Sequence, residues 1–511
     1  MTDRGITGKS IQWKYPSSSW TLKKIDISVS QGSFLLITGA SGSGKSTLCS
    51  TFNGLIPRTR QGLFEGEIKV FGRDTRETPV SALSRDVGMV LQNADSQLFN
   101  SSVSRELSYG LESMGLPRDK IDQRVKDDAE LFGIKHLLER DPKHLSGGEQ
   151  KIVLIAAIFA MRPRILVLDE PFANLDYPSI LLVKSVLRTC LETGMGVVVC
   201  EHRIHLLFHE AERIVVMENG TIRFDGTPAE ALSADLSILK QRFKPADLKL
   251  PKRQKESKNQ TIKPEPVLEC RGLYCRRDDI SVLHNINLTI HRGESVAILG
   301  KNGAGKTTLL RHFNGLIRPD KGSVTVSGVE TRSTQVHELA KQVGLVFQNP
   351  DHQFFRRTVR EEVETGAKAL GSFDAGRIEN LLKRLDISHL SSQLPFFASE
   401  GEKKRIAVAS VLSGDQSILI LDEPAEGLDW ISLDSLAVLL NELVSLGHTL
   451  VIVTHDAWFA RLVANRWIIL SDGTVAADGS PESLISDTRL ISRAGLDTSF
   501  FHPRSGAAYY A

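Results

Sequence analysis

The chain is poor in the features that mark secreted, membrane-spanning or strongly basic nucleic-acid-binding proteins. It has five cysteines in 511 residues and no paired CxxC set, so we expect reduced cysteines in a cytosolic protein. Its net charge of +2 gives no electrostatic argument for nucleic acid. The apolar run nearest to a membrane helix, residues 152–161, falls short of the roughly 18 to 20 residues required, and the N-terminus has no signal-like pattern. If the protein serves a membrane, we expect a peripheral subunit.

The sequence is instead rich in internal repetition, and its length is too great for one hydrophobic core. The segments that recur in the same order are GASGSGKST (39–47) and GKNGAGKTT (300–308), residues 87–99 and 343–355, LVLDEP (166–171) and LILDEP (419–424), and residues 197–202 and 451–455. The residue pairs that stand 253 positions apart are Asp169 and Asp422, His202 and His455, and Ser146 and Ser399. This regularity predicts a tandem duplication of one domain of about 230 residues.

The composition between the copies predicts where each domain ends. We place the first domain at 1–239 and the second at 267–495. Residues 240–266 are rich in Lys and Pro and poor in large apolar residues, which is typical of an exposed linker. A nucleic-acid-binding arm is the weaker interpretation, because no aromatic residues alternate with the basic ones. Residues 496–511 form the expected C-terminal tail.

Each copy alternates short apolar runs with stretches of helical periodicity. The runs FLLITG, ILVLD and GVVVCEH are rich in Leu and β-branched residues, as buried parallel strands are. The predicted fold class is α/β, with the functional residues at the carboxyl ends of the strands.

A glycine-rich phosphate loop follows the first such strand in each copy and precedes a helix. This context supports a P-loop, in which backbone N–H groups and a lysine surround the phosphates of ATP and a hydroxyl binds Mg²⁺. The residues predicted to hold ATP here are Gly39, Ser41, Gly42, Gly44, Lys45, Ser46 and Thr47 in the first copy, and Gly300, Asn302, Gly303, Gly305, Lys306, Thr307 and Thr308 in the second.

Four further residue types stand at the ends of predicted strands in both copies. An aspartate at a strand end can hold Mg²⁺, usually through water, and the glutamate after it can polarise the attacking water. The histidine can contact the γ-phosphate, and the glutamine can reach both metal and water. The catalytic candidates are Glu170, Glu423, His202, His455, Gln92 and Gln348. The metal candidates are Ser46, Thr307, Asp169, Asp422, Gln92 and Gln348.

The segments LSGGEQ and ASEGEK precede these aspartates and fit the S-x-x-E capping box of a helix start. A cap alone does not call for two glycines, which would let N–H groups approach a phosphate closely. The second copy has Glu400 in place of the first glycine. A carboxylate about 6 Å from a phosphate charge, at an effective dielectric near 20, costs on the order of 3 kcal/mol per charge pair unless the side chain swings away.

Taken together, these segments resemble the ATPase domain of ABC proteins, twice and over nearly the whole chain. The resemblance implies a mainly parallel sheet core, an antiparallel β subdomain and a helical signature subdomain in each copy. It also implies that the two domains pair head to tail as an intramolecular pseudo-dimer. Each ATP would lie between the P-loop of one domain and the signature of the other. The signature residues implied to bind ATP are Ser146, Gly147, Gly148, Ser399 and Gly401.

The crossed pairing makes the two expected sites unequal. The first P-loop would face the altered signature with Glu400, and the second would face the intact one, so we expect the second site to do most of the hydrolysis. The family usually stacks an aromatic residue on adenine, and Tyr15 fits that place in the first copy. The second copy has Arg276 or Arg277 there, with Tyr274 nearby, which puts adenine stacking in doubt.

The segments QNADSQLF and QNPDHQFF, with the residues after them, resemble the energy-coupling factor (ECF) and cobalt importers. This likeness implies a transmembrane coupling subunit docking at grooves near residues 93–106 and 349–362, and a membrane substrate-binding subunit. It also implies a place on the cytoplasmic face of the cell membrane and uptake of a vitamin, a vitamin precursor or a metal ion. No nucleic acid is expected.

Two alternatives remain open. A ribose-type sugar importer typically has a degenerate second P-loop, whereas GKNGAGKTT is intact. A soluble tandem ATPase acting on ribosomes or nucleic acid would have a longer helical linker, a cysteine cluster or large insertions, none of which this sequence has.

Overall fold

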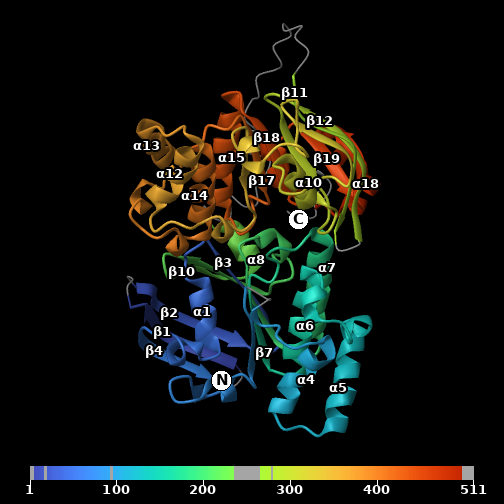
Figure 1. Cartoon of the computed structure of the whole chain (residues 1–511). Helices are drawn as coiled ribbons and strands as arrows, with labels where there is room; N and C mark the ends of the chain where they lie inside the picture. Colours follow the sequence, from blue (N-terminus) through green and yellow to red (C-terminus); the bar gives the residue numbers. More distant parts are fainter. Residues whose placement is uncertain (1–4, 17–19, 93–95, 235–264, 278–279, 498–511) are drawn as a thin grey trace. The chain divides into compact units, whose positions relative to one another are not determined.

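The computed structural model describes residues 5–16, 20–92, 96–234, 265–277 and 280–497. The chain divides into two compact units, Met1–Pro245 and Ala246–Ala511, here called domain one and domain two (Figure 1). The predicted linker lies outside the described residues except for its last two positions, and the predicted tail except for its first two. The predicted domain boundaries therefore stay predictions.

A six-stranded sheet forms the centre of domain one, in the order β10-β9-β3-β8-β7-β6. Every pair is parallel except β9 with β10. All residues of β3, β7 and β8 are buried, which is why these strands are continuous apolar runs. The strands are β3 Phe34–Gly39, β6 Val87–Val90, β7 Ile165–Asp169, β8 Gly196–Cys200, β9 Arg213–Glu218 and β10 Thr221–Gly226. Their parallel run brings the carboxyl ends of β3, β6, β7 and β8 to one edge.

A second, four-stranded antiparallel sheet has the order β2-β1-β4-β5. Buried and exposed residues alternate along β2, as expected for a sheet with one solvated face. Its apolar face packs with the helix that follows the P-loop, α1 Lys45–Phe52, in one core that includes Trp13 and Phe52. The strands are β1 Gly5–Lys14, β2 Trp20–Ser30, β4 Leu63–Val70 and β5 Arg73–Asp74.

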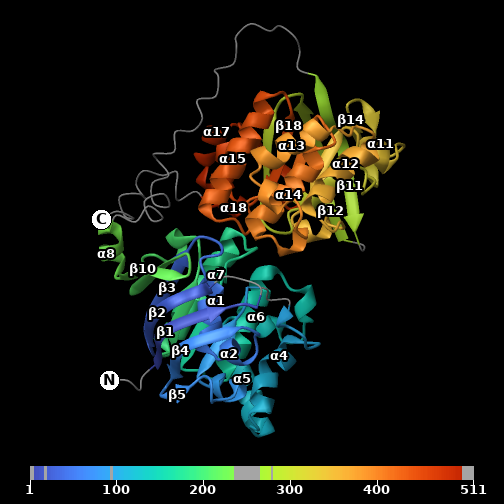
Figure 2. The same cartoon turned by 90° about the vertical axis from the view of Figure 1, so that its left-hand side faces the viewer.

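The longer helices of domain one lie on the other side from the antiparallel strands (Figures 1 and 2). The long helices are α4 Val103–Ser113, α5 Arg118–Leu131, α6 Gly147–Ala160 and α7 Tyr177–Glu192, and they share one apolar core with the parallel sheet. The short ones are α2 Leu55–Arg58, α3 Val80–Leu83, α8 Pro228–Ser233, η2 Lys135–Leu137, η3 Pro142–His144 and η4 Ile204–Leu206. Helix α6 is apolar on most sides because it is buried in this core.

Domain two repeats this plan. Its six-stranded sheet has the order β16-β17-β18-β13-β19-β20, and its antiparallel sheet has the order β12-β11-β14-β15. The strands are β11 Pro266–Arg277, β12 Ile280–His291, β13 Ser295–Leu299, β14 Lys321–Val326, β15 Val329–Glu330, β16 Val343–Val346, β17 Ile418–Asp422, β18 Thr449–Thr454, β19 Arg466–Ser471 and β20 Thr474–Gly479.

The helices of domain two are α10 Lys306–Phe313, α11 Val336–Leu339, α12 Val359–Leu370, α13 Ala375–Arg384, α14 Glu400–Leu412, α15 Trp430–Ser445, α16 Ala457–Val463, α17 Pro481–Ile485 and α18 Thr488–Ala494, with η6 Pro350–His352, η7 Ser388–Leu390 and η8 Pro395–Phe397. Figure 1 shows α12, α13 and α14 gathered on one side of the domain and the antiparallel strands on the other. The α/β class, the duplication and the three-part plan of each domain are confirmed.

Candidate active sites

Each P-loop connects the end of a parallel strand to the first residue of a helix. Gly44 and Gly305 stand directly before α1 and α10 with φ of 100° and 95°, a left-handed conformation that favours glycine. Lys45 Nζ donates to the carbonyl oxygens of Gly39 (3.1 Å) and Ala40 (2.9 Å). Lys306 Nζ does the same to Gly300 (2.7 Å) and Lys301 (3.0 Å). In each loop the lysine ammonium is therefore bonded to two carbonyl oxygens of the loop itself. A bound phosphate group could accept these hydrogen bonds in their place.

A hydroxyl and a carboxylate meet beside each loop. Ser46 Oγ donates to Asp169 Oδ1 at 3.0 Å, and Thr307 Oγ1 donates to Asp422 Oδ1 at 3.2 Å. Both aspartates are buried at the ends of β7 and β17, and burial raises the pKa of each to about 6. A hydroxyl oxygen beside a buried carboxylate suits Mg²⁺, which prefers hard oxygen ligands. The cation would also neutralise the negative charge of the ionised aspartate.

The glutamates that follow these aspartates, Glu170 and Glu423, are here called the strand-end glutamates. Both have left-handed backbones, with φ of 47° and 45°, which is a strained conformation for a residue with a side chain. The amides are fixed, because Glu170 N donates to Cys200 O at 2.9 Å and Glu423 N to Val453 O at 2.8 Å. The neighbouring parallel strand thus holds each glutamate at the carboxyl edge of the sheet.

In domain one, the structure brings the predicted glutamine, glutamate and histidine together. Gln92 Nε2 donates to Glu170 Oε2 at 2.8 Å. His202 Nδ1 lies 3.7 Å from Glu170 Oε1. The grouping of these three residues at one edge of the sheet agrees with the expectation from their strand-end positions.

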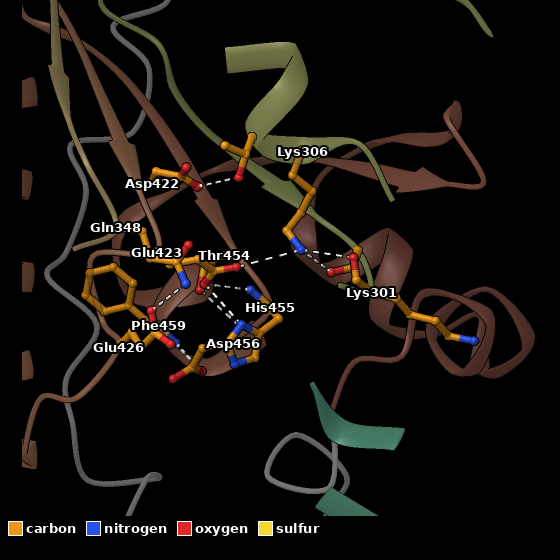
Figure 3. Close-up of polar contacts among 12 residues, drawn as sticks. Lys301, Lys306, Gln348, Asp422, Glu423, Glu426, Thr454, His455, Asp456 and Phe459 are labelled. Atoms are coloured by element: carbon orange, nitrogen blue, oxygen red, sulfur yellow. Dashed lines mark hydrogen bonds and ion pairs between the residues drawn. The ribbon is translucent and has the colours of Figure 1, made fainter. Parts of the chain in front are cut away.

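Domain two arranges the corresponding residues differently (Figure 3). His455 Nδ1 lies 3.1 Å from Glu423 Oε2, and Lys306 Nζ lies 3.7 Å from Glu423 Oε1. Burial alone would raise the pKa of Glu423, but these two cations outweigh burial and the pKa falls to about 2. Burial would likewise lower the pKa of His455, and Glu423 raises it instead. Gln348 Nε2 donates not to Glu423 but to Glu426 Oε2, at 2.8 Å.

Two further carboxylates, which belong to none of the predicted motif residues, lie at these sites. One is Glu426, which replaces Ala173 of the first copy. The other is Glu201, directly before His202, which replaces Thr454 of domain two and is 0% exposed. A comparison of the copies position by position would have found both, because each adds a charge that the other copy lacks.

The signature segments start helices in both domains, and the predicted capping boxes are confirmed. Ser146 precedes α6 and exchanges hydrogen bonds with Glu149, and Ser399 precedes α14 and does the same with Glu402. The two glycine positions of each signature differ in their surroundings. A Cβ at Gly148 would meet Ser179 Oγ at 2.6 Å, whereas the nearest atom to a Cβ at Gly147 is 3.5 Å away. Packing within the domain therefore requires only the second glycine.

That difference explains how Glu400 is accommodated at the first glycine position. Its side chain is 50% exposed, and Oε1 lies 3.4 Å from Lys403 Nζ. Lys403 also lies 2.9 Å from Asp351 Oδ1. The first copy has Gln150 in place of Lys403. Domain two thus carries both the extra negative charge and a cation that partly neutralises it.

A lysine further along each signature helix ties that helix to the predicted glutamine. Lys151 Nζ donates to Gln92 O at 2.7 Å, and Lys404 Nζ donates to Gln348 O. Lys404 also reaches Glu423 O at 3.3 Å, and burial lowers the pKa of its ammonium. In domain two the side chain of Lys404 therefore links the signature helix to the backbone carbonyl oxygens of Gln348 and Glu423.

Tyr15 lies next to the P-loop of domain one. Its hydroxyl is 3.3 Å from Thr47 Oγ1, and its ring packs edge-on against Trp13. In domain two Arg276 N donates to Asp320 Oδ2 at 2.6 Å, and Tyr274 is partly exposed. Adenine contact by Tyr15 stays a prediction that this position supports.

The comparisons with known proteins agree with this arrangement of P-loops and strand-end acids. The sequence profile of a family described as ABC transporter matches residues 22–173 and 283–426. The chain belongs to the ABC transporter family. It is the ATP-binding subunit of an ABC transporter, an ATPase coupled to transport, and its two domains bind ATP.

Two relatives align with this chain over most of their own length. An ABC transporter ATP-binding protein of Caldanaerobacter subterraneus is 32% identical over 97% of this chain and 95% of its own length. One of Methanosarcina acetivorans is 36% identical over 90% and 87%. A solved structure of cbiO1 from Clostridium perfringens, described as part of the ABC transporter complex cbiONQ, is 32% identical and matches 48% of this chain and 100% of its own, with a TM-score of 0.42. Among the helices of the described ranges, none is long and apolar enough to cross a membrane.

Proposed function

We propose that this subunit energises an importer of the ECF type, in which the two domains of one chain pair head to tail and close around two ATP molecules. The observation that carries the proposal is the presence, in each domain, of a complete P-loop, a hydroxyl–aspartate pair and a strand-end glutamate. One chain thus contains two sets of hydrolytic residues and two signature caps. In the proposed pairing, each P-loop uses the signature of the other domain.

The residues of each domain suggest how ATP arrival would prepare hydrolysis. Lys306 and His455 contact Glu423, and both side chains can donate to a γ-phosphate. Their transfer to the phosphate would leave Glu423 free to accept a proton from water. Mg²⁺, held by Thr307 and Asp422, would neutralise phosphate charge. Loss of the γ-phosphate would then let the domains separate and move the membrane partner.

The two proposed sites differ in their signatures. The site of the first P-loop would contain Ser399, Glu400 and Gly401, and the site of the second would contain Ser146, Gly147 and Gly148. Glu400 disfavours an anion, although Lys403 reduces the penalty and the half-exposed side chain is screened by water. We propose that the second site performs most of the hydrolysis.

Lys403→Gln is expected to weaken ATP binding at the first site by about threefold to tenfold, because it leaves the charge of Glu400 without its cation. Binding of a fluorescent ATP analogue to the hydrolysis-deficient double variant Glu170→Gln, Glu423→Gln measures this affinity. The matched control combines Lys403→Gln with Glu400→Gly and restores both residues of the first copy. Equal weakening with and without Glu400 would contradict the proposed role of its charge.

The proposed docking surface for the membrane partner lies after each glutamine. Phe99 and Phe355 are 60% and 66% exposed. A buried glutamate fixes each of these turns, because Glu106 Oε2 accepts the amides of Phe99 and Asn100 and Glu362 Oε2 accepts those of Phe355 and Arg356. An exposed aromatic residue on a rigid turn suits a hydrophobic partner. Residues 93–95 of the predicted first groove lie outside the described residues.

Co-expression with the neighbouring membrane subunits tests this surface. The wild-type chain is expected to sediment with membranes, and the double variant Phe99→Glu, Phe355→Glu to shift mostly to the supernatant. A matched control changes Leu63 and Leu446, which are 53% and 63% exposed, to Glu. Sedimentation of the wild-type chain with ribosomes instead of membranes would contradict the importer proposal. The imported compound is proposed to be a vitamin, a vitamin precursor or a metal ion, on the resemblance of QNADSQLF and QNPDHQFF to ECF ATPases.

A further inference from the structure

Each domain places one additional carboxylate close to its strand-end glutamate, here called the third carboxylate, but the two domains supply it from different segments. In domain one it is Glu201, on the residue directly before His202. In domain two it is Glu426, three residues after Glu423. The other copy has an uncharged residue at each position, Thr454 and Ala173. The third carboxylate is therefore on the histidine side of the first site and on the glutamine side of the second.

In domain one the third carboxylate holds the histidine. Glu201 Oε1 accepts the backbone N–H groups of His202 and Arg203, both at 2.9 Å. It lies 3.2 Å from His202 Nδ1, nearer than Glu170 Oε1 at 3.7 Å. Arg203 Nε is 3.6 Å away, and its guanidinium donates to Phe172 O at 2.5 Å. One oxygen of Glu201 is thus hydrogen-bonded while the other has no hydrogen-bond partner among the described residues, and His202 Nδ1 lies closer to Glu201 than to Glu170.

In domain one the hydrogen bond to the strand-end glutamate comes from the glutamine and not from the histidine. Gln92 Nε2 donates to Glu170 Oε2 at 2.8 Å. Domain one has Ala173 where domain two has Glu426, so no second carboxylate competes for this amide from that side. The carboxylate of Glu170 therefore accepts a hydrogen bond from a neutral amide.

Domain two shows the opposite choice (Figure 3). Gln348 Nε2 donates to Glu426 Oε2 at 2.8 Å, and His455 Nδ1 contacts Glu423 Oε2 at 3.1 Å. The residue before the histidine is Thr454, whose hydroxyl accepts the amide of Asp456 at 3.0 Å and carries no charge. Thr454 also hydrogen-bonds Glu423, and its side chain is no carboxylate that could compete for His455.

We propose that Glu201 and Glu426 are positioning residues that decide which side chain, the glutamine or the histidine, rests on the strand-end glutamate before ATP binds. The reason is a competition between carboxylates for one donor each, in which the nearer and better-oriented acceptor wins. The inference rests on the proposed catalytic roles of Glu170 and Glu423. It adds that the two sites start their cycles from different states, one with glutamine on the base and one with histidine.

The proposal has a kinetic consequence in domain two. If Gln348 must reach the metal and the attacking water, its bond to Glu426 has to break in every cycle. Glu426 touches neither the P-loop nor the phosphate site in the contacts described, so its removal acts on the chemical step and not on ATP binding. This separates a positioning role from a loss of folding, which would alter both.

The test replaces Glu426 by the residue of the other copy, in a chain whose first site is silenced. Relative to Glu170→Gln alone, Glu170→Gln with Glu426→Ala is expected to raise kcat about fivefold, the worth of one net hydrogen bond, and to leave the KM for ATP within about twofold. A crystal structure of the nucleotide-free variant is expected to show Gln348 Nε2 released from the position where Glu426 holds it in the parent. Glu426→Gln, which keeps an acceptor of the same shape, is expected to return kcat most of the way to the parent value.

Glu201→Thr is the matched test in domain one. Its nucleotide-free structure is expected to show His202 Nδ1 within hydrogen-bond distance of Glu170, as His455 is of Glu423. An unchanged position of Gln348 or of His202 in these structures overturns the proposal. So does an unchanged kcat, or a joint change of kcat and KM, in Glu426→Ala. If the parent Glu170→Gln chain itself fails to hydrolyse ATP, the two sites are fully coupled and the proposed dominance of the second site fails, while the two structures still decide the positioning roles.

Discussion

Glu423→Gln is expected to lower steady-state ATP turnover at least about 100-fold, whereas Glu170→Gln leaves a substantial remainder. Removal of a general base typically costs about 100-fold to 10,000-fold. The larger share falls on Glu423 because its proposed site has the intact signature, with Gly147 where domain two has Glu400. Turnover of both purified single variants, measured with any co-purifying membrane subunits, checks the prediction.

The contacts of Glu423 add a physical reason for this inequality. Its carboxylate is held between His455 and Lys306 at 3.1 and 3.7 Å, and its pKa falls to about 2. A carboxylate with so low a pKa is ionised but is a weak base until its cations leave. In the proposed mechanism the γ-phosphate draws them away, so that nucleotide binding and activation of the base would coincide.

Two controls make the comparison of the glutamates decisive. Both variants should bind the fluorescent ATP analogue as the wild type does, since glutamine preserves the shape of the side chain. Glu192→Gln changes an exposed glutamate at the end of α7, outside the proposed sites, and should alter turnover little. Equal losses in Glu170→Gln and Glu423→Gln would show that the sites are equivalent or fully coupled, and that Glu400 is tolerated without functional cost.

The main features of the fold could be predicted from the sequence because they depend on local patterns. A buried parallel strand such as Ile165–Asp169 is a continuous apolar run, and a P-loop has fixed glycine spacing. The capping boxes at Ser146 and Ser399 are equally local. Each of these signals lies within about ten residues, so no knowledge of tertiary contacts is needed.

The arrangement around the strand-end glutamates could not be predicted in the same way. Gln92 and Gln348 each find a carboxylate 78 residues further along the chain, but one partner is Glu170 and the other is Glu426. The acceptor depends on whether a carboxylate stands at the position of Ala173 and Glu426 and on how near the folded loops bring it to the glutamine. The contact between Glu400 and Lys403 could be predicted from the sequence, because residues three apart on a helix are neighbours. The contact between Lys403 and Asp351 joins segments 52 residues apart and could not be predicted in this way.

The two buried aspartates of the proposed metal sites are expected to change the stability of the protein with pH. Burial raises the pKa of Asp169 and Asp422 from 3.8 to about 6. The folded carboxyl keeps its proton to higher pH than the unfolded one, so the folded state binds more protons between about pH 4 and 6. The free energy of unfolding therefore falls as pH rises through this window. At pH 7 each ionised aspartate costs about 3 kcal/mol, from about 1.4 kcal/mol per unit of pKa.

Asp169→Asn and Asp422→Asn are accordingly expected to stabilise the nucleotide-free protein at pH 7.5 and to raise the melting temperature of their own domain by several degrees. Asparagine keeps an oxygen that can accept from Ser46 or Thr307 and removes the buried charge. Melting curves at pH 7.5 and pH 4.5 measure the effect, which should largely vanish at the lower pH, where the wild-type carboxyls are protonated.

Added Mg²⁺ and ATP should reverse this order of stability. The bound cation neutralises the buried negative charge of the aspartate. The wild type therefore gains stability by mass action, while the asparagine variants gain much less. A variant that melts below the wild type at pH 7.5 without nucleotide would show that the aspartates contribute to the fold through their contacts with Ser46 and Thr307. The expected result instead assigns their burial to function: each domain accepts an unfavourable charge in the empty state, and that charge is stabilised only when the metal and nucleotide arrive.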